Sequence, residues 1–210
     1  MKYAIILSGG MGSRFWPLSR QRKPKQFLKI CSSSSLIEET LTRIRPLMAR
    51  ENIYIAASSI HSEKIKGYLR KSGIPLKNVL LEPEGKNTLG PIAMLSKRIV
   101  NLDPEAVITV LPCDHFIKDK AGFLKLVRKG TGIAQQGYIV TLGVPPGRPE
   151  TGYGYIKIKS RHRDFCTVEK FIEKPNLARA RGFLNDKRYY WNAGIFIFRA
   201  DVMLDRKSVV

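Results

Sequence analysis

Short apolar segments alternate with amphipathic segments along the first two thirds of the chain, and this alternation constrains the fold more than any other feature. The segments of strand character cover 2–7, 52–57, 78–81, 106–111 and 138–142. Between them, apolar residues recur at helical spacing over 36–48, 62–71, 88–100 and 123–136. Ser34 or Ser35 could cap the first of these helices. Repeated strand–helix units favour a doubly wound, mostly parallel, Rossmann-like α/β sheet with helices on both faces.

The pattern changes after Pro145-Pro146-Gly147. Closely spaced strands are predicted at 153–159 and 166–173, followed by a helix at 177–184 and a strand at 195–198. Strands this close together favour antiparallel pairing, so we expect a small antiparallel insertion. We treat 1–210 as a single domain with a first part, 1–145, and a second part, 146–210.

The charge balance points to an anionic partner. Lys and Arg total 37 against 17 acidic residues, giving a formal charge of +20. Nucleotides and nucleic acids both fit such a charge. The basic residues are spread along the chain without an arginine-rich tail or a basic amphipathic helix, which argues against a dedicated nucleic-acid or membrane-surface binder. The apolar run Ala4–Leu7 is too short for a membrane span or a signal peptide, so we expect a soluble cytoplasmic protein.

A glycine-rich loop follows the first predicted strand and has the sequence Ser8-Gly9-Gly10-Met11-Gly12-Ser13-Arg14. Glycines let backbone N–H groups approach phosphate oxygens closely. Phe15 stands where the dinucleotide fingerprint needs its third glycine, and the loop has no Gly-Lys-Ser or Gly-Lys-Thr of a P-loop. The cations that could hold phosphate are therefore Arg14, as a fork, and Lys25, as a point charge. The alternative is a glycine turn with exposed cations.

A carboxylate follows the strand predicted at 106–111, in the segment Leu111-Pro112-Cys113-Asp114-His115. In α/β proteins ligands bind at the carboxyl ends of the strands. Mg²⁺ prefers carboxylate oxygens together with substrate phosphates, so we predict Asp114 as a Mg²⁺ ligand. The alternative for an isolated aspartate here is a turn or a helix cap. His115 has no second histidine or cysteine at ligand spacing, which favours a hydrogen-bonded structural role.

These residues carry a family resemblance. The segment from Leu7 to Ser19, together with Pro24-Lys25-Gln26-Phe27-Leu28, resembles the signature of the sugar nucleotidyltransferases, and within them the mannose-1-phosphate guanylyltransferases (GDP-mannose pyrophosphorylases). The resemblance implies the nucleotide-diphospho-sugar transferase fold, with Arg14, Lys25 and Asp114 as the catalytic set. It implies nucleotide contacts for Leu7, Ser8, Gly9, Gly10, Gly12, Ser13, Arg14 and Lys25. We expect Trp16 and Phe27 to lie in the core.

The segment from Leu81 to Thr88 resembles the guanine-recognition segment of that family, which would place Glu82, Asn87 and Thr88 near the base. A carboxylate can accept hydrogen bonds from N1–H and N2–H₂ of guanine, which adenine does not offer. The segment departs from the family pattern at Lys86, where the family usually has Arg, and at Leu89-Gly90, where it usually has Ala-Pro. Without the resemblance, Asn87-Thr88 would be interpreted as a helix cap.

Three further segments resemble the sugar-binding part of the family: 149–156, 171–175 and 190–196. The resemblance implies contacts with the sugar or its phosphate for Gly152, Tyr153, Glu173, Lys174 and Asn192. It therefore implies that 1–145 is the nucleotide-binding half and 146–210 the sugar-binding half. Taken alone, Glu173-Lys174 is an exposed charged pair and Asn192 a turn residue.

The activity implied by the resemblance is formation of GDP-mannose and pyrophosphate from GTP and α-D-mannose 1-phosphate, with Mg²⁺. Three alternatives stay open: the same fold with another base or hexose 1-phosphate, as in a glucose-1-phosphate thymidylyltransferase; a noncatalytic nucleotide-sugar-binding fragment; and a nucleic-acid binder. The fragment is considered because the family domain usually continues past the position of Val210 and carries a second metal-binding aspartate there. A homo-oligomer also stays open.

Overall fold

The computed structural model describes residues 1–10, 15–20, 24–30, 32–83 and 88–205. The chain divides into two compact units. The first comprises Met1–Val140 with Phe196–Val210, and the second comprises Thr141–Ile195. The strand β8 (Tyr189–Arg199) crosses this division, so its last residues belong to the first unit and its earlier residues to the second.

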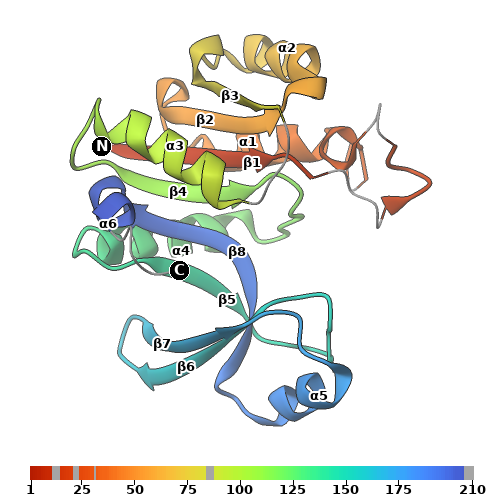
Figure 1. Cartoon of the computed structure of the whole chain (residues 1–210), viewed down its shortest axis with the longest axis vertical. Helices are drawn as coiled ribbons and strands as arrows, with labels where there is room; N and C mark the ends of the chain where they lie inside the picture. The colour runs from red at the N-terminus through yellow and green to blue at the C-terminus, as the bar shows by residue number, and fades with distance from the viewer. Residues whose placement is uncertain (11–14, 21–23, 31, 84–87, 206–210) are drawn as a thin grey trace. The chain divides into compact units, whose positions relative to one another are not determined.

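The first unit contains a parallel sheet in the order β3-β2-β1-β4 (Figure 1). Its strands are β1 (Lys2–Ser8), β2 (Ile53–Ser58), β3 (Val79–Glu82) and β4 (Val107–Pro112). Each neighbouring pair among these four strands is parallel, and the end of β8 adds to β4 in antiparallel orientation. The mostly parallel sheet that the sequence predicted is confirmed, with strand ends within one or two residues of the predicted ones.

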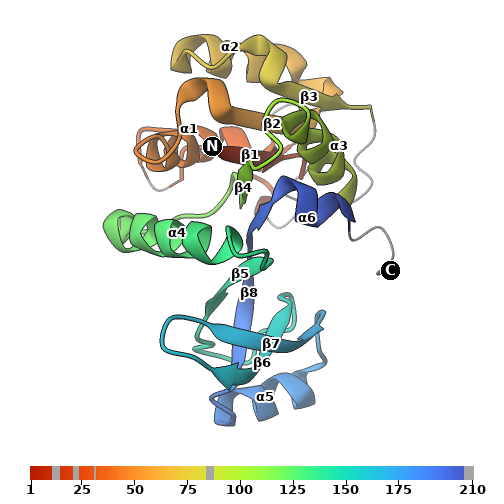
Figure 2. The same cartoon turned by 90° about the vertical axis from the view of Figure 1, so that its left-hand side faces the viewer.

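Helices cover both faces of this sheet. They are α1 (Leu36–Ile44), α2 (Ser62–Ser72), α3 (Leu89–Val100), α4 (Lys120–Ala134) and α6 (Ala200–Asp205). Figure 2 shows α1 and α4 on one side of β1 and β4, and α3 and α6 on the other. Within the described residues, 3₁₀ turns are formed by η2 (Lys25–Phe27), η3 (Arg50–Asn52), η4 (Ser59–His61) and η5 (Leu76–Asn78). The doubly wound arrangement is therefore confirmed.

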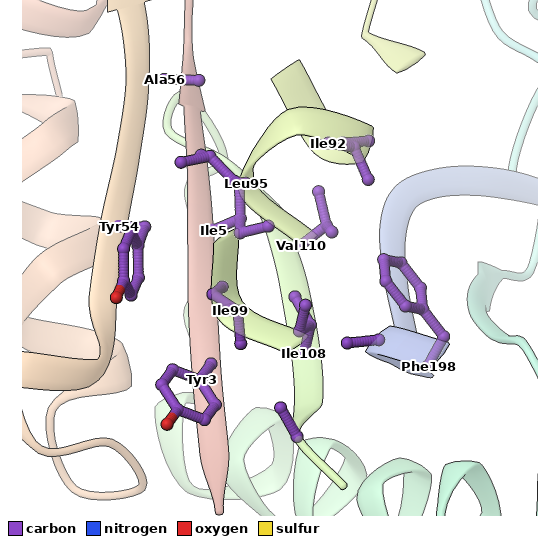
Figure 3. Packing of buried hydrophobic residues seen from close by; sticks show 12 residues of the cluster. Tyr3, Ile5, Tyr54, Ala56, Ile92, Leu95, Ile99, Ile108, Val110 and Phe198 are labelled. Carbon is purple, nitrogen blue, oxygen red and sulfur yellow. The ribbon is translucent and has the colours of Figure 1, made fainter. Parts of the chain in front are cut away.

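The core under α3 shows why the central strands are continuously apolar (Figure 3). Ile92, Leu95 and Ile99 of α3 pack on Ile5 of β1 and on Val110 of β4. The residues of β1 that alternate with Ile5 point to the other face of the sheet. They are equally buried, because helices cover that face too. A strand covered on both faces needs an unbroken apolar run, as the sequence has here. Each buried Ile or Leu contributes about 1.5–3 kcal/mol relative to an exposed one.

The start and the end of α1 are both set locally. The Ser35 side chain accepts a hydrogen bond from the Glu38 N–H, and the Glu38 carboxylate accepts one from the Ser35 N–H, which makes a capping box. The predicted serine cap is confirmed at Ser35. The helix ends at Ile44, four residues before the predicted end, because Pro46 has no N–H to donate to the carbonyl of the preceding turn, although Arg45 itself keeps helical backbone angles.

The second unit is antiparallel, as predicted. β6 (Tyr155–Arg161) pairs with β7 (Cys166–Ile172) and with β8, and β5 (Val140–Val144) also pairs with β8. The helix α5 (Leu177–Asn185) closes a small core in which Phe183 stacks on Tyr189 at 4.0 Å between ring centroids. β8 begins at Tyr189 and not at Ile195, because the aromatic run before Asn192 takes strand geometry and Gly194 accommodates a φ of +65° within it.

The two aromatic residues expected in the core behave differently. Phe27 is buried and stacks on Tyr68 of α2, with ring centroids 5.5 Å apart. The expectation for Trp16 is wrong, since its side chain is 77% exposed. Apolar residues fill cores, but much of a protein surface is apolar too, so an aromatic residue in a loop is weak evidence of burial. Among the described residues, no helix combines the length and the apolar character that crossing a membrane requires.

Candidate functional site

The carboxyl ends of three parallel strands meet at one edge of the sheet in the first unit. Leu7 of β1 pairs with Pro112 of β4, and the Cys113 N–H extends this pairing by donating to the Leu7 carbonyl at 3.1 Å. Glu82 ends β3, and Asp114 follows β4 by two residues. The parallel sheet therefore carries the glycine loop, Glu82 and Asp114 to the same edge, where α/β proteins bind ligands.

The backbone of Gly9 and Gly10 lies close to two charged side chains. A Cβ on Gly9 would lie 3.6 Å from Oε2 of Glu82. A Cβ on Gly10 would lie 3.1 Å from Cε of Lys25, which is tighter than ordinary van der Waals contact. Glycine at position 10 thus lets the Lys25 side chain lie directly against the loop. The structure brings together Gly9, Gly10, Lys25 and Glu82, which the sequence assigned to one site.

An ion pair joins the two residues assigned to phosphate and metal. The Lys25 ammonium bonds Oδ2 of Asp114, and the two side chains are only 23% and 22% exposed. Lys25 is on η2, whose next residue, Gln26, is buried and donates from Nε2 to the Ser8 carbonyl at 3.0 Å. The hydrogen bond from Gln26 fixes η2, and with it Lys25, to the end of β1. Asp114 follows β4, so the two partners of the ion pair are held at the ends of neighbouring strands.

Burial keeps two neighbours of this ion pair, Cys113 and His115, uncharged near neutral pH. It raises the pKa of the Cys113 thiol to about 12, so a thiolate is not available near neutral pH. It lowers the pKa of His115, which keeps the imidazole neutral, and it raises the pKa of the Glu82 carboxyl above its ordinary 4.5. Cys113 and His115 therefore contribute no charge near neutral pH beside the Lys25–Asp114 pair.

Two side chains of α1 hold the backbone on both sides of Asp114. Thr40 Oγ1 donates to the Cys113 carbonyl at 3.1 Å, and Arg43 Nη1 donates to the His115 carbonyl at 3.0 Å. Sequence reasoning missed these roles, and it left Gln26 without one. Thr40 was counted only as part of the buried face of a predicted helix. The sequence contained one indication of these roles. Arg43 lies three residues after Thr40 on the same buried face, where a charged side chain needs hydrogen-bond partners.

The side chains that could bind a metal ion at this edge suit a cation that enters the site bound to a nucleotide. Among the described residues, no group of three or more His, Cys, Asp and Glu side chains could hold a metal ion. Asp114 offers a half-buried carboxylate oxygen at the ligand-binding edge, next to the cation assigned to phosphate. Mg²⁺ is commonly bound by one or two carboxylates with substrate phosphates and water completing its coordination. The residues present therefore fit Mg²⁺ carried by a triphosphate better than an all-protein metal cage.

In the second unit, the structure brings together Glu173 and Asn192 around Gly154. A Cβ on Gly154 would lie 2.9 Å from Oε2 of Glu173 and 3.7 Å from Cβ of Asn192. The Asn192 N–H donates to the Gly154 carbonyl at 2.8 Å. The Asn192 Oδ1 atom accepts from the Gly194 N–H at 2.9 Å and from Thr141 Oγ1 at 3.3 Å, which fixes the plane of the amide. Thr141 is a contact that the sequence pattern did not indicate.

Lys174 extends this group and carries an unusual backbone. Its φ is +39°, in the left-handed region that costs a residue with a side chain free energy. The ammonium of Lys174 pairs with Oε1 of Glu173 at 3.0 Å, and both side chains are exposed. The pair predicted from sequence is therefore present, and the strained backbone of Lys174 fixes the direction in which the chain leaves β7.

The loop before β6 is braced by side chains. The Gly152 N–H donates to Glu150 Oε1 at 3.0 Å. The Tyr153 ring meets Trp191 edge to face at 5.5 Å, and the Arg148 guanidinium lies 5.7 Å from the centroid of the same indole. Gly152 and Tyr153, which the sequence assigned to the sugar, therefore sit in a fixed turn. The supporting role of Trp191 was not predicted.

Four predicted site residues, Gly12, Ser13, Arg14 and Asn87, lie outside the described residues. Thr88 is exposed and stands at the N-cap position of α3, where its side chain makes no capping hydrogen bond. The position of Thr88 thus matches the helix-cap alternative, although the bond that defines such a cap is missing.

Comparison with known proteins identifies the family of this chain. A family model described as Nucleotidyl transferase matches residues 3–209. The xanthan biosynthesis protein XanB of Xanthomonas campestris is 42% identical over 201 residues, which are 96% of this chain and 43% of that protein. A mannose-1-phosphate guanylyltransferase of Salmonella muenchen is 40% identical over 205 residues, 95% of this chain and 43% of that protein. The chain thus spans less than half the length of these two relatives.

A solved structure gives the same result for the fold. The crystal structure of a protein described as a mannose-1-phosphate geranyltransferase from Thermus thermophilus superposes with a TM-score of 0.88 at 34% identity. The match covers 96% of this chain and 58% of the other. This chain therefore belongs to the nucleotidyl transferase family and has the nucleotide-diphospho-sugar transferase fold.

Proposed function

We propose that this protein joins GTP and α-D-mannose 1-phosphate into GDP-mannose and releases pyrophosphate. The observation that carries the proposal is the half-buried Lys25–Asp114 ion pair beside Gly10, at the ligand-binding edge of the parallel sheet. This pair supports the proposal because it would provide a cation for phosphate and a carboxylate for Mg²⁺ in one group. The name of the Salmonella relative, a mannose-1-phosphate guanylyltransferase, supports the choice of base and sugar.

On the nucleotide side, the backbone N–H groups of Gly9 and Gly10, with Lys25 and Arg14, would bind the triphosphate. Glu82 would accept hydrogen bonds from guanine, since its carboxylate lies beside Gly9 on the same sheet edge. Asn87 and Thr88 would complete the base contacts. Leu7, Ser8, Gly12 and Ser13 would shape the loop that surrounds the phosphates.

On the sugar side, Glu173 and Asn192 would bind the hydroxyl groups of the hexose, and Lys174 would bind its phosphate. The carboxylate of Glu173 and the fixed amide of Asn192 suit vicinal diols, and both lie beside Gly154. Gly152 and Tyr153 would approach the ring from the braced loop. A lysine that is already exposed can bind a phosphate without breaking a buried contact.

The reaction would be a direct displacement. An oxygen of the mannose phosphate attacks the α-phosphorus of GTP, the bond from that phosphorus to the β-phosphate bridging oxygen breaks, and pyrophosphate leaves with the bonding electrons. Mg²⁺ bound at Asp114 would supply charge neutralisation on the phosphates. Lys25 and Arg14 would offset the remaining repulsion between two anionic substrates. Positioning and charge stabilisation would account for most of the rate, because no covalent enzyme intermediate is needed.

The decisive experiment removes the carboxylate. We expect Asp114→Asn to lower Mg²⁺-dependent pyrophosphate release by about 10²–10³-fold, the range for losing one preorganised charge-stabilising group. Circular dichroism would check that the fold is intact. Normal turnover in this variant would refute the role of Asp114. Assays against four nucleoside triphosphates and several hexose 1-phosphates separate the proposal from the thymidylyltransferase alternative, since GTP and mannose 1-phosphate must be the preferred pair.

A further inference from the structure

Arg43 is a buried cation whose contacts lead to the backbone around Asp114. Its side chain is on the buried face of α1, and the residue is 5% exposed. Nη1 donates to the His115 carbonyl at 3.0 Å, and Nη2 donates to Thr40 Oγ1 at 2.7 Å. Thr40 in turn donates to the Cys113 carbonyl at 3.1 Å. One guanidinium and one hydroxyl thus hold the carbonyls of the two residues that flank Asp114.

Burying this guanidinium is costly, and packing alone does not require it. Desolvation lowers the pKa of Arg43, which shows that its surroundings disfavour the charge. An apolar side chain of similar volume would fill the same space against Phe123 of α4, whose ring centroid lies 5.6 Å from the guanidinium carbon. What the buried charge adds is two directed hydrogen bonds, which an apolar side chain does not make.

The segment 113–115 needs such support because the sheet stops holding it. β4 ends at Pro112, and the Cys113 N–H makes the last hydrogen bond to β1. Beyond this point the backbone of the segment is bonded by Thr40 and Arg43 of α1, and the Asp114 carboxylate is bonded by Lys25. Fixing the carbonyls of the two residues on either side of Asp114 limits the directions in which its side chain can point.

We propose that Arg43 and Thr40 are positioning residues that hold the Asp114 carboxylate in place for the divalent cation bound to the nucleotide. This inference rests on the proposed function, in which Asp114 binds that cation. The arginine is specific because its rigid fork bonds a carbonyl and a hydroxyl at once, whereas a lysine ammonium is a single point of attachment. Outer residues that orient a metal ligand affect metal affinity without touching the metal.

The test measures how much Mg²⁺ strengthens GTP binding. Isothermal titration calorimetry gives the dissociation constant of GTP in Mg²⁺ and in EDTA. The constant in EDTA divided by the constant in Mg²⁺ is the metal-linked gain in affinity. We expect Thr40→Val and Arg43→Met to lower this ratio by about tenfold, the lower end of the range for losing an outer partner of a metal ligand, while affinity in EDTA is unchanged. The variant Thr40→Ser keeps the hydroxyl, so its ratio should equal that of the wild-type protein.

Two exposed residues of the same segment provide matched controls, Thr42→Val and Arg45→Met, which should leave the ratio unchanged. A wild-type ratio in both Thr40→Val and Arg43→Met would overturn the positioning role. So would equal losses of affinity in Mg²⁺ and EDTA, because they would indicate general damage to the site. Should Arg43→Met fail to fold in thermal melting, the nearly isosteric Thr40→Val decides the question. Wild-type protein without a metal-linked gain would instead refute the proposed function, and this inference with it.

Discussion

The nucleotide-side residues of the first unit and the sugar-side residues of the second unit are held in different ways. Lys25 and Asp114 are 89 residues apart in sequence, half-buried and paired with each other. Glu173 and Lys174 are neighbours in sequence and exposed. In the first unit a buried glutamine and a buried arginine support the site from other elements, whereas Asn192 is held by the backbone of Gly194, two residues away, and by the part-buried Thr141 of β5.

The difference follows from what each set would bind. Charges withdrawn from water must be paired, so a site for a triphosphate and a metal needs its cation and its carboxylate fixed before the ligand arrives. Sugar hydroxyls are neutral, and an exposed carboxylate such as Glu173, whose partner Lys174 is also exposed, can bind them without breaking a buried ion pair. The comparison predicts that substitutions on the nucleotide side disturb catalysis strongly, while those on the sugar side act mainly on sugar affinity.

The largest effect is expected from Lys25→Met. This change removes the cation assigned to phosphate and leaves the half-buried Asp114 carboxylate without its partner. We expect kcat/KM for pyrophosphate release to fall by about 10²–10³-fold, the scale for one preorganised charged donor. Steady-state kinetics at saturating mannose 1-phosphate measure it.

The control for Lys25→Met is Lys29→Met, which changes an exposed lysine nearby and should retain full activity. A loss below tenfold in Lys25→Met would place the phosphate-binding cation elsewhere. Equal losses in the two variants would mean that the overall positive charge of the protein, and not the fixed ion pair, governs GTP binding.

A smaller effect is expected from Gly154→Ala in the second unit. The new methyl group would lie 2.9 Å from Oε2 of Glu173 and would displace that carboxylate. We expect KM for mannose 1-phosphate to rise about tenfold, the scale of one hydrogen bond involving a charged group, with GTP affinity unchanged. Stability should change by less than about 1 kcal/mol, since the clash is with the end of an exposed, flexible side chain.

The matched control is Gly147→Ala, since a Cβ at that position meets no atom within 4 Å. It should leave both the sugar affinity and the thermal stability unchanged. A parallel loss of GTP affinity in Gly154→Ala would contradict the comparison, because it would show that the sugar-side residues also support the nucleotide.

The sequence predicted the strands, the helices and several of the residues that the structure brings together at the edge, because these depend on local patterns. The continuous apolar run of β1 requires cover on both faces, and the carboxyl ends of parallel strands share an edge. The position of Asp114 after a strand therefore predicted its place at the ligand-binding edge, while the family resemblance assigned Gly9 and Glu82 to the nucleotide. The capping serine of α1 was predictable for the same reason, since the capping box lies within four residues.

The supporting residues could not be predicted because their partners are distant in sequence. The bond from Thr40 to the Cys113 carbonyl spans 73 residues, and the bond from Thr141 to Asn192 spans 51. No local pattern distinguishes a threonine that holds a site from one that fills a core. The prediction that Trp16 lies in the core was wrong for a different reason. Hydrophobicity indicates which residues can be buried, but not which of them the fold buries.

The smallest effect concerns the pH dependence of stability at Glu82. Burial raises its pKa above the ordinary 4.5 in the folded protein, while the unfolded chain keeps the ordinary value. As the pH rises from 4.5 toward the raised pKa, the folded state therefore holds this proton longer than the unfolded state does. Since the folded state binds more protons in that range, the free energy of unfolding falls as the pH rises through it and is constant above it, as far as this group is concerned.

Glu82→Gln removes this titration, so the difference in unfolding free energy, variant minus wild type, should increase from pH 4.5 upward and then level off. Urea unfolding at a series of pH values measures it, and Glu82→Asp, which keeps an ionisable carboxyl, should retain the wild-type trend. A difference that does not vary with pH would mean that Glu82 is no less hydrated than an exposed glutamate. The carboxylate would then not be held out of water beside Gly9, and the contrast between a prepared nucleotide side and an open sugar side would be limited to the Lys25–Asp114 pair.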